Sequence, residues 1–402
     1  MFSSRFHWDF RTNRLTQALE AMRRSGARIL DLTESNPTRA GLEYPPEIVR
    51  AFDDPRMLVY EPSPAGAIEA REAVASYYEA RGARVETGRI LLTASTSEAY
   101  AWLFKLLCDA GDHVLVPRPS YPLFEFLANL ESVEARQYPL AYHGGWSIDL
   151  DSLAAAVCER TRAVVLVNPN NPTGSYVKRA ELQALSRLCA ERRIALISDE
   201  VFSDYALGEA AGSEAAERVP TLVGVEECLA FSMSGLSKVA GLPQMKLGWI
   251  VTSGPAKLRA EAMEKLEWIA DTYLSVSTPV ACAAAKLLAS GASVQRQIRK
   301  RTAGNLAVAR EMLAGSAAGI LAVEGGWYIT VRMPRIRSEE DWAIQLLSQE
   351  GVLTQPGFFY DFESEAFLIV SLLTMPEVFR EGMVRLRRAV EWRDKKTLPE
   401  EL

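Results

Sequence analysis

The chain has 402 residues and an ordinary globular composition, with 48% hydrophobic and 24% charged residues and a formal net charge of −6 at pH 7. This length suits roughly two or three domains, each with a sizeable core. The basic residues are dispersed, which argues against a nucleic-acid-binding surface, and no stretch approaches the roughly 18 apolar residues of a membrane helix.

Cysteine and histidine usage indicates a reduced protein without a metal site. The five cysteines are far apart and form no CxxC pair, as expected in a cytosolic protein. The three histidines are scattered, so the sequence predicts no metal ligation. The N-terminal residues lack the apolar run of a secretory signal, and we expect a cytoplasmic location.

The first ninety residues alternate helical patterns with polar loops. Apolar residues at helical spacing predict helices over 14–25 and 68–79. Two turn-rich loops, Asp31–Arg39 and Tyr60–Gly66, separate them. The first loop either covers a cleft or links two elements, and the second begins with a phenol.

From residue 89 to about 240, short apolar segments alternate with helical patterns. Strands are expected at 89–93, 113–117, 162–167, 194–198 and 228–231, and helices after Ser95, at 123–130 and at 180–193. This alternation predicts βαβ units and a largely parallel sheet with helices on both faces. Ligands of such sheets bind beyond the carboxyl ends of the strands. The loops at those ends contain Ser95, Tyr121, Asn171, Asp199 and Lys238.

The rest of the chain predicts a second layer. A long helix expected at 255–272 leads out of the sheet domain. After about residue 290, helices are expected at 294–313, 339–350 and 377–392, and strands at 321–323, 327–331 and 367–372. This order indicates a separate α+β domain, on which we expect the N-terminal helix to pack. The expected division is an N-terminal arm that joins the small domain at 1–45, a large domain at 46–285 and a small C-terminal domain at 286–402.

Lys238 occupies an unusual position in this pattern. It follows the buried strand expected at 228–231, and serine, glycine and proline around it break any regular period. We therefore expect Lys238 to project from a tight loop at a strand end. Loss of hydration there favours a neutral amine, which attacks carbonyl groups to form a Schiff base. The alternative is an ordinary surface lysine.

Together these loops resemble the active site of the fold-type I pyridoxal phosphate enzymes, and within them the class I/II aminotransferases. The resemblance covers nearly the whole chain. Its most specific parts are the turn Asn168–Gly174, the Asp-Glu-Val-Phe segment that ends at Phe202, and Ser-Gly-Leu-Ser-Lys ending at Lys238 with a basic residue eight positions on. It implies a mostly parallel sheet flanked by helices in a large domain, with a smaller α+β domain built from both termini.

The resemblance implies a role for each residue around the cofactor ring. Lys238 would form the Schiff base and later move a proton at the substrate Cα. Asp199 would accept a hydrogen bond from the pyridinium nitrogen, Asn171 would bind the phenolic oxygen, and Tyr121 would stack on the ring. Taken singly, Asp199 also suits a helix cap, Asn171 a plain turn, and Tyr121 a half-buried turn.

The cofactor phosphate is expected at the start of the helix after Ser95, where backbone N–H groups and hydroxyls converge. Plain N-capping is the alternative there. Ser237 is also expected to bind the cofactor. The residues expected around the phosphate are Ser95, Thr96, Ser97, Lys246 and, from the neighbouring subunit, Tyr60. The last of these implies a homodimer. Lys246 stands where the family usually has arginine, so charge is kept but the bidentate fork is lost.

Two further departures concern chemistry and substrate. Phe202 stands where many members have a tyrosine, which leaves Asn171 alone to bind the phenolic oxygen. Ile369 stands where the family usually carries the arginine that binds the substrate α-carboxylate. Either another arginine substitutes, with Arg39 beside Asn36 the first candidate and Arg332 the second, or the substrate is not an ordinary α-amino acid.

The function that the resemblance implies is an aminotransferase that moves an amino group between an amino acid and a 2-oxo acid by ping-pong chemistry. A carbon–sulfur β-lyase or a decarboxylase of the same fold is the first alternative, because the carboxylate-binding arginine is absent. A non-catalytic module that senses pyridoxal phosphate is more remote, since regulators of this fold carry an added DNA-binding domain. The expected partners are small molecules and a second copy of the chain.

Overall fold

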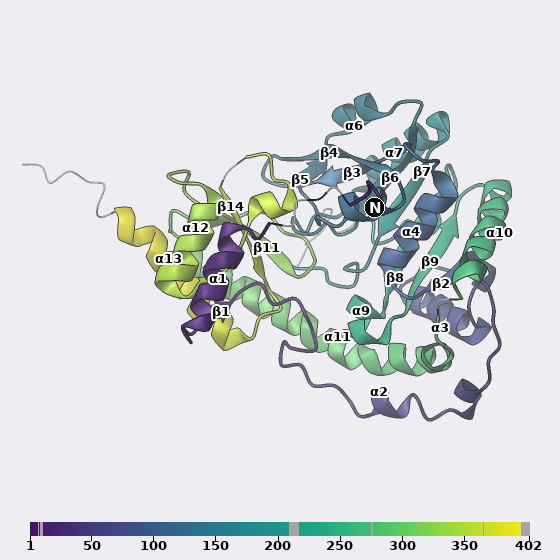
Figure 1. Cartoon of the computed structure of the whole chain (residues 1–402), viewed down its shortest axis with the longest axis horizontal. Coiled ribbons are helices and arrows are strands. Elements are labelled where there is room, and N and C mark those ends of the chain that lie inside the picture. Colours follow the sequence, from purple (N-terminus) through teal and green to yellow (C-terminus); the bar gives the residue numbers. More distant parts are fainter. Residues whose placement is uncertain (7, 9–10, 209–216, 275, 365, 395–402) are drawn as a thin grey trace, which may run out of the picture.

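The computed structural model describes the chain apart from residues 7, 9–10, 209–216, 275, 365 and 395–402. The molecule has a large lobe and a small lobe, joined by a long helix (Figure 1). Within the described part of the chain, no helix is long and apolar enough to cross a membrane. Among the same residues, no group of three or more His, Cys, Asp or Glu side chains is placed to hold a metal ion.

The large lobe is organised around an eight-stranded sheet with the strand order β2-β9-β8-β7-β6-β3-β4-β5. The strands are β2 (Ile90–Thr93), β3 (His113–Arg118), β4 (Glu134–Tyr142), β5 (Trp146–Ile148), β6 (Thr161–Val167), β7 (Ala195–Asp199), β8 (Ala230–Gly235) and β9 (Gly248–Ser253). Strands β4, β3, β6, β7 and β8 run parallel, whereas β9 and β5 run antiparallel to their neighbours. The predicted parallel core is confirmed, although β4, β5 and β9 were not predicted.

Helices cover both faces of this sheet, which explains its unbroken apolar strands. One face is covered by α4 (Thr96–Leu107), α5 (Phe124–Leu130) and α10 (Ala256–Tyr273), and the other by α6 (Leu150–Ala156) and α7 (Arg179–Arg192). In β6, Ala163 and Val165 pack with the first set, and Val164 and Leu166 pack with the second. Side chains alternate along a strand, so burial on both faces requires an apolar residue at every position.

The small lobe is a four-stranded antiparallel sheet, β10-β11-β14-β13, with helices on one face. Its elements are α1 (Arg14–Arg24), β10 (Gly319–Ile320), β11 (Tyr328–Arg332), α12 (Glu339–Gln345), β13 (Gln355–Pro356), β14 (Phe367–Ser371) and α13 (Pro376–Asp394), and beside them β1 (Leu30–Asp31) pairs with β12 (Val352–Leu353). Leu15 shares an apolar core with Trp342 and Phe379, which confirms the predicted packing of the N-terminal helix. The strand predicted at 321–323 is wrong, because this segment turns toward the large lobe, where the Glu324 N–H donates to the Gly174 carbonyl (3.1 Å).

Helix α11 (Thr278–Leu313) spans 36 residues and joins the two lobes. Its first half packs in the large lobe and its last turns pack in the small one, so the expected boundary between 285 and 286 falls inside a continuous helix. The sequence predicted this helix only from residue 294, because Gly291 weakens a helix prediction across that position. In the structure a Cβ at Gly291 would lie 2.3 Å from the Cβ of Ala240. The glycine therefore allows α11 to approach the segment that follows Lys238.

Candidate active site

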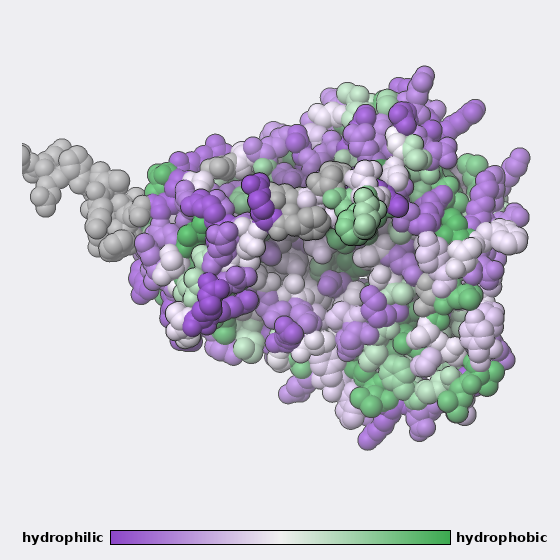
Figure 2. All heavy atoms as spheres, viewed as in Figure 1, coloured by the Kyte–Doolittle hydropathy of each residue, from purple (hydrophilic) through white to green (hydrophobic). Residues whose placement is uncertain are grey.

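A cavity of about 310 Å³ opens at the carboxyl ends of the parallel strands. Figure 2 shows the molecular face hollowed between the two lobes. The predicted residues that line the cavity are Ser95, Thr96, Ser97, Tyr121, Asn171, Asp199, Phe202, Ser237, Lys238 and Lys246. Ser35 and Tyr328 line it as well. The convergence of loops predicted from the strand pattern is therefore confirmed.

Four predicted residues do not line this cavity, and three of them lie on the N-terminal loops. Tyr60 is 70% exposed and shares a separate depression with Leu274. Asn36 is half-buried, and its Oδ1 accepts hydrogen bonds from the N–H and hydroxyl of Thr38 (3.0 and 2.8 Å). Arg39 is exposed. The structure thus brings neither Asn36 nor Arg39 into the lining.

The fourth residue, Arg332, lies on the cavity-facing side of the small sheet but at the far end of β11. Opposite residues of an antiparallel pair share a face, and Tyr328 pairs with Ser371 while Arg332 pairs with Phe367. Arg332 lies four residues after Tyr328 along the strand, a distance of about 13 Å. Arg332 lines a second cavity that shares no residue with the first. Its position therefore gives no support to the predicted substrate role.

Lys238 stands on α9 (Leu236–Val239), a single helical turn directly after β8, so the tight loop predicted there is wrong. Its Nζ lies 5.9 Å from the ring centre of Phe202 and 5.2 Å from that of Trp327. Burial lowers the pKa of Lys238, and the charge of Asp199 opposes this shift. Burial therefore shifts this amine toward its neutral form, in the direction that the sequence predicts.

Asp199 ends β7 and carries the acidic group of the cavity. Its Oδ1 accepts the N–H of Val201 (3.2 Å), and its Oδ2 accepts the hydroxyl of Tyr100 (3.3 Å). Burial raises the pKa of Asp199 to about 6, although both hydrogen bonds and Lys238 favour the ionised form. A cationic N–H placed against this carboxylate would offset its desolvation. Tyr100 was not among the predicted site residues, yet a buried phenol needs a partner for its hydroxyl.

The N-terminus of α4 lies at one end of the cavity. Ser95 caps the helix, and its Oγ accepts the N–H of Glu98 (3.2 Å). The N–H groups of Thr96 and Ser97 belong to the first turn, where the helix supplies no acceptor and its dipole is positive. Lys246 adds a full positive charge from a left-handed backbone position (φ 52°). Such an arrangement suits a phosphate group.

Asn171 presents a buried amide to the cavity. It is 6% exposed, and its Oδ1 accepts no hydrogen bond from any described residue. The turn that carries it is held by Asn170, whose Oδ1 accepts the hydroxyl of Thr173 (2.9 Å). Gly174 closes the turn with φ 71°, where a Cβ would lie 2.5 Å from the carbonyl oxygen of Gly325. The turn therefore holds the Oδ1 of Asn171 where a ligand could supply its missing hydrogen bond.

Comparisons of the sequence and of the structure with known proteins all find aminotransferases. A family model for aminotransferase class I and II matches residues 27–380. The glutamate-pyruvate aminotransferase AlaA of Escherichia coli strain K12 is 28% identical over 384 residues, covering 92% of both chains. An alanine aminotransferase of Mycobacterium tuberculosis is 28% identical over 364 residues, covering 87% of this chain and 82% of its own. The structure of an alanine aminotransferase from Pyrococcus furiosus has a TM-score of 0.87 at 21% identity, over 98% of this chain and 100% of that one.

Proposed function

The chain belongs to the class I and II aminotransferases, and we propose that this pyridoxal phosphate-dependent enzyme takes amino donors with apolar or aromatic side chains and no second carboxylate. One observation carries this proposal: among the described residues that line the cavity, the basic side chains are those of Lys238 and Lys246, and neither is an arginine. The relatives compared above are aminotransferases, which favours transamination over the β-lyase, decarboxylase and cofactor-sensing alternatives.

The cavity residues suit pyridoxal phosphate at each of its polar groups. The start of α4 and Lys246 match the phosphate, and Asn171 offers an amide N–H to the phenolic oxygen. Asp199 offers a carboxylate to the N–H of the ring nitrogen. When bound, the cofactor supplies an aldehyde that links to the amino group and a ring that withdraws electrons from Cα.

Lys238 is the proposed acid and base for the proton on the substrate Cα. Its lowered pKa shifts Nζ toward the neutral form that can accept that proton, and the resulting ammonium can return it. The rings of Phe202 and Trp327 flank Nζ and restrict its positions. Asp199 holds a negative charge where positive charge must be kept on the ring nitrogen. Tyr121 lines the same cavity, and its ring would cover that of the cofactor.

The substrate α-carboxylate meets no guanidinium in the described lining. Ile369, 1% exposed, pairs with Thr330 and Gln355 in the middle of the small sheet. The hydroxyls of Ser35 and Tyr328 are the neutral donors on this side of the cavity. A neutral hydrogen bond contributes about 0.5–1.5 kcal/mol, against about 1.5–3 kcal/mol for one to a charged group. We therefore expect the enzyme to discriminate only weakly between amines with and without an α-carboxylate.

Substrate preference tests this proposal directly. We expect alanine, phenylalanine and tyrosine to react with a kcat/KM at least about tenfold above that of aspartate and glutamate, because a second carboxylate would be desolvated without a cation. Tyramine, which lacks the α-carboxylate, should fall less than about tenfold below tyrosine. The visible absorbance of the cofactor reports each half-reaction with a single donor. A preference for glutamate, or a loss above about 100-fold with tyramine, would contradict the proposal. Either result would mean that a cation from outside the described lining binds the substrate carboxylate.

The enzyme is further proposed to be a homodimer, with Tyr60 reaching the neighbouring active site. Apolar side chains gather over α2 (Glu47–Arg50) and the segment after it (Figure 2). Val49, Leu58 and Tyr60 are 76%, 85% and 70% exposed, and Trp268 on α10 is 70% exposed. An exposed apolar patch of this kind marks a contact between proteins.

Charging that patch should separate the subunits. We expect Leu58→Glu to shift the sedimenting mass from twice 44.4 kDa toward 44.4 kDa, because the carboxylate would be buried in the interface. Ile336→Glu is the matched control, since Ile336 is 63% exposed on the small lobe. Tyr60→Phe should keep the dimer but weaken cofactor binding by about tenfold through loss of one hydrogen bond. A monomeric wild type would contradict the proposal.

A cytoplasmic location is also proposed. It is supported by the five cysteines, all of which are free in the structure, as suits a reducing compartment.

A further inference from the structure

A second cavity, of about 350 Å³, lies where the β4–β5 hairpin of the large lobe meets the small lobe. Arg118, Tyr142 and Trp146 line it from the large lobe, and Arg332, Arg335 and Phe362 line it from the small lobe. None of these residues lines the cavity that holds Lys238. The second cavity is therefore a separate space, built from both lobes.

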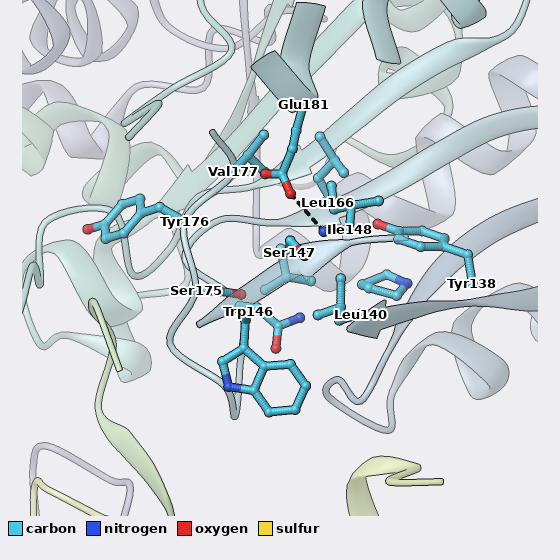
Figure 3. A pocket seen from close by; sticks show the side chains of 13 residues that line it. Tyr138, Leu140, Trp146, Ser147, Ile148, Leu166, Ser175, Tyr176, Val177 and Glu181 are labelled. Carbon is cyan, nitrogen blue, oxygen red and sulfur yellow. Dashed lines mark hydrogen bonds between the residues drawn. The ribbon is translucent and has the colours of Figure 1, made fainter. Parts of the chain in front are cut away.

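Trp146 and Leu140 also border a smaller pocket, which Figure 3 shows from close by. That pocket has room for only about 20 Å³, which is the size of a water site. Its carboxylate belongs to Glu181, which accepts the N–H of Ile148 (2.7 Å) and the N–H of Lys178 (2.7 Å). Glu181 thus has a structural role, and of the two spaces beside Trp146 only the larger can take an organic ligand.

The larger cavity is rich in positive charge. Three guanidinium groups face one carboxylate within the described lining, and Arg118 already pairs with that carboxylate on Glu363. The side chains of Arg332 and Arg335 are exposed and form no hydrogen bond or ion pair with any described residue. Planar guanidinium groups without a partner at a cavity wall suit a carboxylate or phosphate, which they can bind through two parallel hydrogen bonds.

Two buried N–H donors at the same cavity also lack acceptors. The Nε1 of Trp146 and the Nε of Arg118 are buried, and neither has a hydrogen-bond partner among the described residues. Trp146 as a whole is only 9% exposed. Leaving such a donor unsatisfied is costly, so a bound acceptor would be favoured. These two donors and the guanidinium groups of Arg332 and Arg335 would all be satisfied by an anion that accepts hydrogen bonds.

The remaining walls are aromatic. The ring centres of Trp146 and Tyr142 lie 5.0 Å apart, those of Trp146 and Phe362 6.1 Å apart, and those of Phe362 and Phe367 4.8 Å apart. These rings pack against one another, and the aromatic surface that they turn to the cavity can contact another flat ring by stacking or by its edge. We propose that this cavity binds a small organic anion, a carboxylate or phosphate ester that carries a flat ring.

The proposed site stays accessible in the proposed dimer. Strand β5 forms one edge of the large sheet and β2 forms the other. The loop with Tyr60 lies beside β2, because a Cβ on Gly66 would lie 2.6 Å from a Leu92 side-chain carbon. The anion cavity adjoins β5, and the exposed apolar patch lies toward β2. Binding at this cavity is therefore independent of the transamination proposal and of the dimer.

Calorimetric titration of the cofactor-loaded enzyme tests the proposal. The probes are adenosine 5′-monophosphate and 1-naphthoate, which distinguish a phosphate ester from a carboxylate, and the controls are adenosine and inorganic phosphate. We expect at least one probe to bind once per chain, and both controls to bind at least about tenfold more weakly, because ring and charge are each required. Absence of saturable binding by either probe up to 5 mM, taken here as roughly the weakest useful affinity, would overturn the proposal.

Variants locate the bound probe. Arg332→Gln combined with Arg335→Gln should weaken binding by at least about tenfold. The control pair Arg296→Gln and Arg310→Gln, on exposed positions of α11, removes the same charge and should leave the affinity within about twofold, since distant surface charges are screened. Trp146→Phe keeps a ring but removes Nε1 and should weaken binding several-fold. Equal affinities for the two arginine pairs would show that the probe binds elsewhere.

Discussion

Replacing Lys238 with alanine is expected to lower kcat for transamination by roughly 10³-fold or more. The other amine in the described lining of the cavity is that of Lys246, at the phosphate end. Among the described lining residues, no second amine is therefore placed to move the proton at the substrate Cα. Single-turnover kinetics with a preferred donor would measure the loss separately from cofactor release.

Three variants make this result specific. Lys238→Arg keeps the positive charge but not a neutral amine, and should be as impaired as Lys238→Ala. Lys265→Ala removes a solvent-exposed lysine paired with Glu261 and should retain the wild-type kcat. Lys246→Gln should reduce affinity for the cofactor more than kcat, because its charge faces the phosphate end. Retention of more than about one tenth of the activity by Lys238→Ala would remove the proposed base from the mechanism.

The sequence predicted the centre of the large lobe better than its edges. Strand β6 reads as an unbroken apolar run because it is buried on both faces, and such a run has few alternatives. Strand β4 carries exposed Glu134 and Gln137 and alternates irregularly, so its pattern resembles a loop. Strand β8 extends to Gly235, beyond the apolar residues, because serines there pair with β9 in the interior. Tertiary contacts decide such segments, and a single sequence does not display them.

The candidate site was predicted where backbone topology alone brings residues together. Asn171, Asp199 and Lys238 follow parallel strands, and the ends of parallel strands share one edge of a sheet. The contribution of the small lobe was harder to foresee, because it depends on how two domains dock. Tyr328 and Arg332 lie on the same face of one strand. Because they are about 13 Å apart, however, Tyr328 lines the cavity of Lys238 and Arg332 lines the second cavity. Spacing along the chain gives the face, whereas docking decides which cavity each residue reaches.

Replacing Asp199 with asparagine is expected to have opposite effects on activity and stability. The kcat should fall by about 10²-fold or more, because a neutral amide no longer stabilises positive charge on the ring nitrogen. Burial raises the pKa of Asp199 to about 6, from an ordinary value of 3.8. A raised carboxyl pKa means that the folded state binds a proton more tightly than the unfolded chain. The stability associated with that proton is complete below pH 4 and is lost as the pH rises through about 6.

The cofactor-free variant should therefore be more stable than cofactor-free wild type at pH 8, by at most about 3 kcal/mol at 1.36 kcal/mol per pKa unit, and no more stable at pH 4. Melting temperatures at the two pH values measure this difference. Glu200→Gln is the matched control, because burial raises the pKa of Glu200 to about 7 but its carboxylate faces Thr221 and the N–H of Leu222 rather than the cavity. It should share the gain in stability at pH 8 and keep a kcat within about threefold of wild type, since it touches no reacting group. A loss of stability in Asp199→Asn at pH 8 would mean that other groups of the protein already stabilise the charge of Asp199. The proposal that a cationic ring nitrogen offsets this charge would then lose its support.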